Sequence, residues 1–252
     1  MGNHFLVNLG GIFTNFALKV NLPIRTVIKK TIFDQFCGGE NVNDCELKIK
    51  LLAKYNVGTI LDYSVEGVGL KDDFQSTVTE IKKTIDAADN SLDIPFSVFK
   101  LTGLTSFSIL KAANDSLDDL NSSQLIEYND FIDRVDQICS YAVEKNVKIF
   151  IDAEDSWFQG SIDRVAEQMM KLYNKKNVFV YTTIQFYRWD RLAYLNDLHA
   201  KCKADKFKIG IKLVRGAYME KERAMAIKMN YKDPIQKDKL STDNDFNRGI
   251  DF

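Results

Sequence analysis

Charged and amide side chains stand at the ends of five short apolar runs in the sequence. Lysine and arginine in such places suit an anionic cofactor or a carboxylate substrate, because a cation and an oxyanion form a strong, charge-assisted hydrogen bond. A glutamine offers both a donor and an acceptor, the pair that recognises an amide-like edge of a ligand. The residues, in chain order, are Asp62 with Glu66, Lys100, Asp152 with Glu154, Gln185, and Lys212 with Arg215.

These side chains need a frame that brings distant segments together. Each apolar run is rich in Val, Ile, Phe or Tyr, as buried strands are, and near-continuous apolarity favours parallel strands covered on both faces. Amphipathic helical patterns alternate with most of the runs. The runs are 59–63, 96–101, 148–152, 178–185 and 208–214, and the helical patterns are 73–88, 123–145, 161–173, 190–204, 219–229 and 243–252.

Strand followed by helix, repeated, predicts an α/β fold with a parallel sheet. Because no Gly-rich dinucleotide fingerprint is present, a (β/α) barrel is favoured over a Rossmann sheet. A closed barrel of this type needs eight strands, and five runs precede the end at Phe252. We therefore expect a TIM-type barrel cut short after about five βα units, over residues 59–252, with a helical segment over residues 1–58. An open sheet is the alternative.

The carboxyl ends of parallel barrel strands converge on one face, where binding sites are built. Ion pairs that only stabilise the barrel would explain a charge at any single strand, but charges or amides at all five favour a site. Gly216 would let a ligand approach the backbone closely. The N–H groups that open the helix after Tyr218 could face a phosphate.

Composition excludes several classes of protein. The 252 residues carry 34 Lys and Arg against 35 Asp and Glu, so the formal net charge of -1 gives no electrostatic case for nucleic acid. The four cysteines form no CxxC pair and there are two histidines, so we expect reduced thiols and no metal site. The first twenty residues make neither a convincing secretory signal nor a membrane span.

Seven short segments of the chain carry specific motifs. They are FCGGE (36–40), LDYSVEG (61–67), FKLTGL (99–104), IDAEDSWFQ (151–159), TIQFY (183–187), KLVRGAYMEKER (212–223) and YKDPI (231–235). These motifs resemble those of the proline dehydrogenase family of flavoenzymes. The matches are collinear and cover most of the chain, and KLVRGAY together with the upstream DAE is highly specific.

The resemblance implies a distorted barrel that holds FAD at its carboxyl end. L-proline would give a hydride from C5 to flavin N5, forming Δ1-pyrroline-5-carboxylate on the route to glutamate. Electrons would pass to a quinone or another respiratory-chain acceptor, which makes peripheral membrane association plausible. The implied location is the cytoplasm or the inner face of an energy-transducing membrane, on the mitochondrial matrix side in a eukaryote.

The resemblance also implies roles for individual residues. Lys100 would be catalytic and would hold the carboxylate of proline, and Asp152 would anchor the catalytic network near the flavin. Ala217 and Tyr218 would border the substrate, with support from Asp62 and Glu66 on the first strand. The implied cofactor-binding residues are Asp152, Gln185, Lys212, Val214, Arg215, Gly216 and Ala217.

The sequence departs from the family near its end. It has no Arg-Arg dipeptide and no Thr-His, the elements by which family members grip the proline carboxylate and contact FAD. We therefore interpret the chain as the N-terminal two-thirds of a catalytic domain of the monofunctional type, and we expect it to be unstable and inactive alone.

Two other readings stay open at this point. A Schiff-base aldolase would use Lys100 or Lys212 as a nucleophile. A non-catalytic barrel fragment would bind flavin or a partner without turnover.

Overall fold

The computed structural model describes residue 19 and residues 24–63 and 71–252. The chain divides into two compact units, residues 1–51 and 52–252. The expected helix at the extreme N-terminus and Glu66 lie outside the described residues. No helix in the described part of the chain has the length and apolarity needed to cross a membrane.

The described part of the first unit is helical. A short helix α2 (Arg25–Ile28) runs into a π-helical turn (Lys29–Phe33) and then α3 (Asp34–Phe36). Helix α4 (Val42–Ala53) follows, and its last two residues belong to the second unit. It begins where Asn41 accepts a hydrogen bond at 3.0 Å from the backbone N–H of Asp44, as an N-cap residue does.

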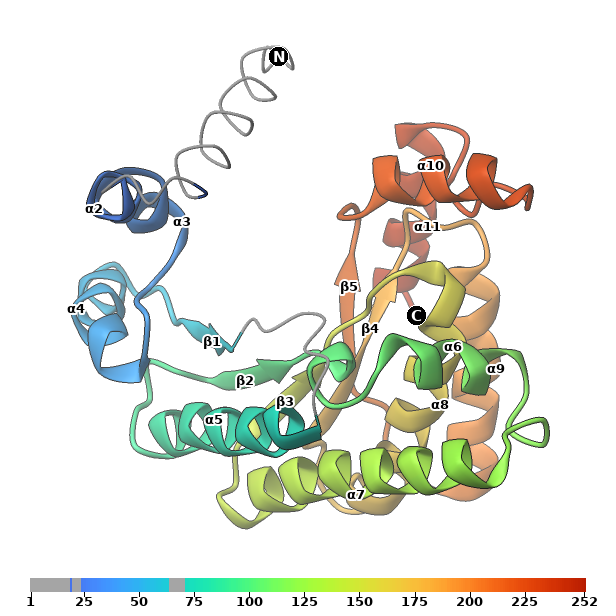
Figure 1. The fold of residues 1–252 in the computed structure, drawn as a ribbon, viewed down its shortest axis with the longest axis horizontal. Helices are drawn as coiled ribbons and strands as arrows, with labels where there is room; N and C mark the ends of the chain where they lie inside the picture. The colour runs from blue at the N-terminus through green and yellow to red at the C-terminus, as the bar shows by residue number, and fades with distance from the viewer. Residues whose placement is uncertain (1–18, 20–23, 64–70) are drawn as a thin grey trace. The chain divides into compact units, whose positions relative to one another are not determined.

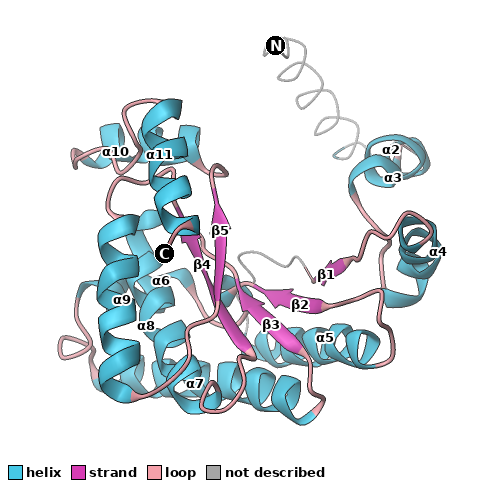
Figure 2. Cartoon of the chain, turned by 180° about the vertical axis from the view of Figure 1, so that it is seen from behind, coloured by secondary structure: helices cyan, strands magenta, loops and turns pink. Residues whose placement is uncertain are grey.

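The second unit is built on five parallel strands (Figure 2). They follow the predicted apolar runs as β1 (Ile60–Asp62), β2 (Phe96–Phe99), β3 (Lys148–Ile151), β4 (Val180–Gln185) and β5 (Ile211–Val214). They lie side by side in chain order, β1-β2-β3-β4-β5. A doubly wound sheet reverses its strand order at a switch point, whereas a barrel does not. The sequential order therefore identifies five consecutive strands of a (β/α) barrel, as expected.

Helices alternate with these strands along the chain (Figure 1). Five of them, α5, α7, α8, α9 and α11, pack against one face of the sheet, and we call the opposite face the inner face. Their bounds, and those of the remaining helices, are α5 (Lys71–Asp89), a 3₁₀ turn (Leu101–Gly103), α6 (Phe107–Asp115), α7 (Ser122–Glu144), α8 (Ser156–Tyr173), α9 (Arg191–Asp205), α10 (Met219–Met229) and α11 (Lys239–Ile250).

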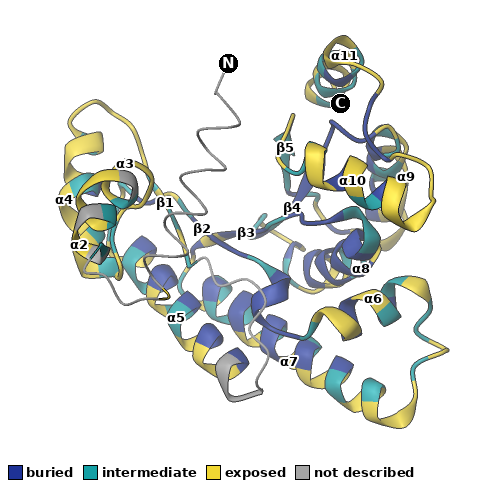
Figure 3. Cartoon of the chain, turned by 45° about the horizontal axis from the view of Figure 1, so that its top comes forward, coloured by how far each residue is buried: buried dark blue, intermediate teal, exposed yellow. Residues whose placement is uncertain are grey.

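The core lies between the sheet and its helices. On α5, the apolar residues Phe74, Val78, Ile81 and Ile85 recur at three- and four-residue spacing and are buried. The sheet-facing sides of the helices are dark in Figure 3. One buried polar contact ties this layer together, because the hydroxyls of Thr84 on α5 and Ser97 on β2 lie 2.7 Å apart.

Local details differ from the sequence expectation in three helices. Helix α8 begins five residues earlier than the pattern predicts, at Ser156, and α6 was not predicted. On α7, Leu125 is 46% exposed although the pattern places it on the buried face. The rest of α7 follows the pattern, since Tyr128, Val135, Ile138 and Ala142 are buried, and Leu125 stands in the first turn of the helix. Helix α10 ends as predicted, at Asn230, which is left-handed with φ 55°.

Candidate functional site

Four charged side chains of alternating sign form a row across the inner face, and we call them the charged row. Lys100 Nζ lies 3.1 Å from Asp62 Oδ2 and 4.0 Å from Asp152 Oδ2. Lys212 Nζ donates to the other oxygen of Asp152, Oδ1, at 2.6 Å. The side chains are 11–31% exposed, Lys100 least and Asp62 most, so the row is sheltered yet open to a small ligand.

Strand register explains why residues so far apart in sequence meet. Asp62 and Val98 are register partners across β1 and β2. Lys100 comes two residues after Val98, so its side chain lies on the same face as that of Asp62. The backbone N–H of Asp152 donates to the carbonyl of Phe99 at 3.0 Å and continues the ladder past the end of β3. Thr183 and Lys212 are register partners across β4 and β5. The parallel arrangement therefore stacks the row at the carboxyl ends.

An aromatic cluster lies on the same face nearer the amino ends of the strands. The rings of Phe96 and Phe150 stack with centroids 4.5 Å apart, and Tyr181 meets both edge-on at 5.5 and 5.4 Å. Lys212 Nζ stands 5.4 Å above the Phe150 ring. The charged row thus rests on an apolar floor, where electrostatic interactions are stronger than in open water.

Gln185 ends β4 on the same face as Thr183, and both hydrogens of its amide are used by the protein. Nε2 donates to the Glu154 carbonyl at 2.7 Å and to the Tyr187 hydroxyl at 2.9 Å. Because the Glu154 carbonyl can only accept a hydrogen bond, the Gln185 atom that faces it must be the amide nitrogen, Nε2. This contact therefore fixes the orientation of the Gln185 amide. Oε1 receives only a long contact, 3.4 Å, from Arg188 Nη1. The acceptor is therefore the group that Gln185 has left for a ligand.

Tyr187 links the end of β4 to the loop after β5. It is fully buried, and its hydroxyl oxygen accepts from Gln185 Nε2 and from the backbone N–H of Tyr218. Burial raises the pKa of Tyr187 well above its ordinary value, so the hydroxyl stays neutral. One side chain thus joins two segments that the sequence assigns to the site.

Helix α10 is held in place by a buried carboxylate. The two oxygens of Glu222 accept from the backbone N–H of Ser156, at 2.6 Å, and from its hydroxyl. Glu222 therefore caps the first turn of α8, where the helix dipole favours negative charge. Burial raises the pKa of Glu222, while the hydrogen bonds from Ser156 oppose the rise. This contact anchors the helix that follows the 215–218 loop.

Arg215 points away from the charged row. Its guanidinium lies 3.5 Å from Asp243 and stacks 4.6 Å from the Phe246 ring, both on α11. It borders a cavity of about 590 Å³ at the start of α11, which Arg223, Lys237 and Lys239 also line. The cavity is rich in cations, so it suits an anionic group.

The structure thus separates the sequence-predicted residues into two places. Lys100, Asp152 and Lys212 meet directly, with Asp62 as a fourth member and Gln185 beside them on the inner face. Arg215 belongs to the cavity at α11. The backbone between them carries Val214, Gly216, Ala217 and Tyr218.

Two contributors to the site, Thr183 and Tyr187, are not among the candidates that the sequence indicates. Thr183 Oγ1 lies within donating distance of the Ile151 carbonyl, at 3.0 Å, and of Asp152 Oδ1, at 3.3 Å. The two-residue period of a strand would have placed it on the same face as Gln185. Glu154, which the sequence does indicate, accepts from both the N–H and the hydroxyl of Thr102, at 3.2 and 2.6 Å, and so joins the ends of β2 and β3. No local sequence pattern indicates a role for Tyr187, because its role depends on the distant 215–218 loop.

Comparison with known proteins agrees with this architecture. The family model for proline dehydrogenase matches residues 45–252. The chain is 28% identical over 280 residues to mitochondrial proline dehydrogenase 1 of Dictyostelium discoideum, covering 95% of this chain and 49% of that protein. It is 27% identical over 217 residues to the carbapenem antibiotics biosynthesis protein CarD of Pectobacterium carotovorum, covering 86% and 56%.

A solved structure shows the same fold. Proline utilization A from Bdellovibrio bacteriovorus superposes with a TM-score of 0.73 at 18% identity, over 88% of this chain and 24% of that one. The chain spans about half the length of the curated relatives described above. The family match covers most of the chain and coincides with the strands that carry the charged row. This chain therefore belongs to the proline dehydrogenase family.

Proposed function

We propose that this protein is an FAD-dependent proline dehydrogenase that oxidises L-proline to Δ1-pyrroline-5-carboxylate. The observation that carries the proposal is the charged row, which gathers Lys100, Asp152 and Lys212 at the carboxyl end of the sheet. Family membership supports the same reaction. We assign residues 59–252 to the catalytic barrel and residues 1–58 to a helical segment before it.

Lys100 is the residue we assign to the carboxylate of proline. It is the least exposed member of the charged row, and carboxylates on both sides hold its ammonium group in place. A substrate carboxylate would compete for the same hydrogens, and Asp152 would keep the paired Lys212 oriented meanwhile. Ala217 and Tyr218, at the mouth of the β5 loop, would border the substrate.

The residues present fit a flavin. A Cβ added to Gly216 would meet only Met219 Sδ, at 3.5 Å, so no protein atom fills the space beside this backbone. Lys212 offers a cation and Gln185 an acceptor on the same face, and the Val214–Ala217 backbone runs beside them. FAD, when bound, would accept the hydride from proline C5.

The cation-rich cavity at α11 would hold the phosphate groups of FAD. Arg215, Arg223, Lys237 and Lys239 stand around it, and Asp238 and Asp243 neutralise only part of their charge. Electrons would leave to a quinone or another respiratory-chain acceptor through peripheral contact with a membrane. In a eukaryote the location we propose is the mitochondrial matrix side, otherwise the cytoplasm or the inner face of the membrane.

The test is the visible spectrum of the purified protein with FAD, recorded anaerobically before and after L-proline. Bleaching of a bound flavin by proline would support the proposal, and it would show that the chain is active although it lacks the Arg-Arg pair. A parallel titration with hydroxyproline ranks the two substrates. Flavin that binds without bleaching would favour a non-catalytic barrel. A colourless protein whose Lys100 or Lys212 traps a carbonyl substrate with borohydride would favour the Schiff-base aldolase.

A further inference from the structure

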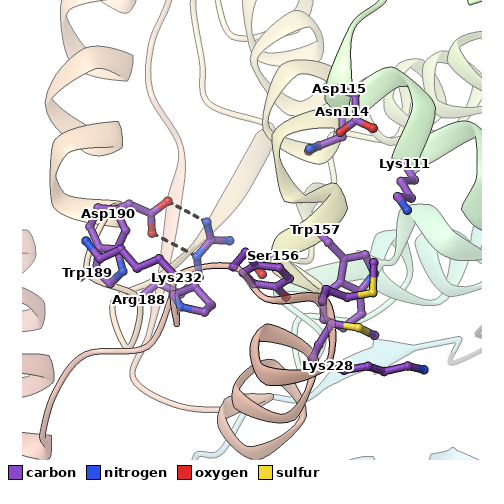
Figure 4. A pocket seen from close by; sticks show the side chains of 14 residues that line it. Lys111, Asn114, Asp115, Ser156, Trp157, Arg188, Trp189, Asp190, Lys228 and Lys232 are labelled. Carbon is purple, nitrogen blue, oxygen red and sulfur yellow. Dashed lines mark hydrogen bonds and ion pairs between the residues drawn. The ribbon is translucent and has the colours of Figure 1, made fainter.

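A second cavity lies away from the inner face, and we call it the outer cavity. It is bordered by the end of α6, the start of α8, and α10 with the segment that follows it (Figure 4). Its volume of about 600 Å³ is in the range of small-molecule sites. None of the residues that line it belongs to the charged row or to the cation-rich cavity at α11.

The walls of the outer cavity are aromatic and thioether side chains. Trp157, Trp189 and Tyr231 line it together with Met225 and Met229, and Figure 4 shows Trp157 and the two sulfur atoms beside one another. Flat rings and polarizable sulfur bind flat apolar groups well. Trp189, Tyr231 and Met229 keep part of their surface exposed, so a ligand that covered them would remove apolar area from water.

The charges around this wall are unbalanced. Lys111, Lys228 and Lys232 line the cavity, and in the described part of the chain none of them forms an ion pair with a carboxylate. Lys232 Nζ sits instead 3.6 Å from the centroid of the Trp189 ring.

The acidic groups of the cavity do not cancel these lysines. Asp190 is already paired with Arg188 through two hydrogen bonds, at 3.1 and 2.7 Å. That leaves Asp115 as the one acidic side chain in the lining to set against three lysines.

We propose that the outer cavity binds an organic anion with a flat apolar body, such as an aromatic carboxylate or sulfonate. The rings and thioethers would hold the body, and the lysines at the rim would hold the anionic group, without the full cost of burying a charge. None of the residues that line this cavity is one that we assign to flavin or proline, and the contact of Arg188 with Gln185 Oε1 at 3.4 Å is a link between the two sites.

The chain offers a direct readout, because it contains two tryptophans and both line the outer cavity. The probe is 8-anilinonaphthalene-1-sulfonate, whose emission can be excited by energy transfer from tryptophan. The matched neutral probe is N-phenyl-1-naphthylamine, which has a similar ring body without the sulfonate. We expect tryptophan-sensitised emission from the anionic probe, and weaker binding of the neutral one.

Charge reversal tests the role of the lysines. The double variant Lys228→Glu with Lys232→Glu should weaken binding of the sulfonate about tenfold, because two attractive exposed charges become repulsive. Lys175→Glu with Lys176→Glu is the matched control, since both lysines are exposed on the loop between α8 and β4, and it should change the affinity less than twofold. The single variant Lys232→Ala gives a milder loss if the double variant folds poorly.

Three results would overturn the proposal. The first is equal affinity of the two probes for the wild-type protein. The second is unchanged affinity in the reversed variant. The third is sulfonate emission with no sensitisation by tryptophan, because the probe would then sit elsewhere.

Discussion

At the residue scale, Asp152 is the centre of the site, because its two oxygens each face a lysine. One oxygen accepts from Lys212 at 2.6 Å and the other lies 4.0 Å from Lys100. Removing this carboxylate takes away the ion-pair partner of Lys212, whereas Lys100 keeps its pair with Asp62. Asp152 should therefore contribute more than Asp62 to positioning the two lysines, because Asp62 contacts Lys100 but not Lys212 within the charged row.

Asp152→Asn should lower proline-dependent reduction of the flavin at least tenfold, roughly the loss of one charge-assisted contact of 1.5 kcal/mol or more. The measurement is the anaerobic rate of bleaching at saturating FAD. Asp62→Asn is the control and should lose less. Equal losses in the two variants would contradict a central role for Asp152.

The buried hydroxyl of Tyr187 gives a second prediction at this scale. Tyr187→Phe keeps the ring in its place but removes the acceptor for Gln185 and for the Tyr218 N–H. We expect FAD to bind about fivefold more weakly, as for one lost hydrogen bond, and hydrogen exchange in the 215–218 loop to quicken even without FAD. Fluorescence titration and mass-detected exchange measure the two effects.

Tyr173→Phe is the matched control for this experiment, because its hydroxyl donates at 2.6 Å to Asp136, between α8 and α7. It should leave both FAD affinity and loop exchange unchanged. If Tyr187→Phe exchanges its loop amides at the wild-type rate, Tyr187 does not hold the loop.

At the scale of elements, helix termini carry much of the local information. Helix α7 opens with a capping box, in which Asn121 accepts from the Gln124 N–H and the Gln124 side chain accepts from the Asn121 N–H, both at 3.0 Å. The long helix packs α5 and β3 together. The stability of the first turn of α7 therefore affects how firmly this helix packs on the sheet.

Asn121→Ala should lower the free energy of unfolding by about 1 kcal/mol, the usual worth of an N-cap. Urea unfolding followed by circular dichroism measures it. Asn196→Ala, at an exposed position inside α9, should raise the free energy of unfolding by a few tenths of a kcal/mol, because alanine is the better helix former. If both variants changed the free energy of unfolding in the same direction, Asn121 would not act as a cap.

At the scale of the whole molecule, the cysteines report on the two compact units. All four are free; Cys37 and Cys45 lie in the first unit, and the buried Cys139 and Cys202 lie in the second. Burial raises the pKa of Cys202 to about 11 and that of Cys139 further still. Because the thiolate is the reactive form, both buried thiols should be inert near pH 8.

A thiol-reactive aromatic disulfide at pH 8 should therefore label the exposed Cys37 in the native protein and leave Cys139 and Cys202 untouched. In increasing urea, the two buried thiols should become reactive in one transition, since one folded unit holds both. Peptide mapping after labelling gives the order. Labelling of Cys139 and Cys202 at clearly different urea concentrations would show that the second unit does not unfold as a whole.

The sequence by itself determined the elements of this protein and the chemistry of its site. Short apolar runs with helical patterns between them settle the parallel βα arrangement, because strand and helix periods are written in neighbouring residues. The end of α10 at Asn230 followed for the same local reason. The residue types at the strand ends, above all Lys100, Asp152 and Lys212, could be picked out because charge is rare beside buried strands.

Only the tertiary structure decided which of these residues meet. Register across five strands placed three predicted residues in one row, whereas the aromatic contact with Phe246 drew Arg215 to a separate cavity. Leu125 shares the periodicity of the buried Tyr128 and Val135 yet is exposed, because only the packing of neighbouring elements decides how much of that side of α7 is covered. Tyr187 and Glu154 join segments distant in the chain, and such long-range hydrogen bonds exist only once the strands have paired.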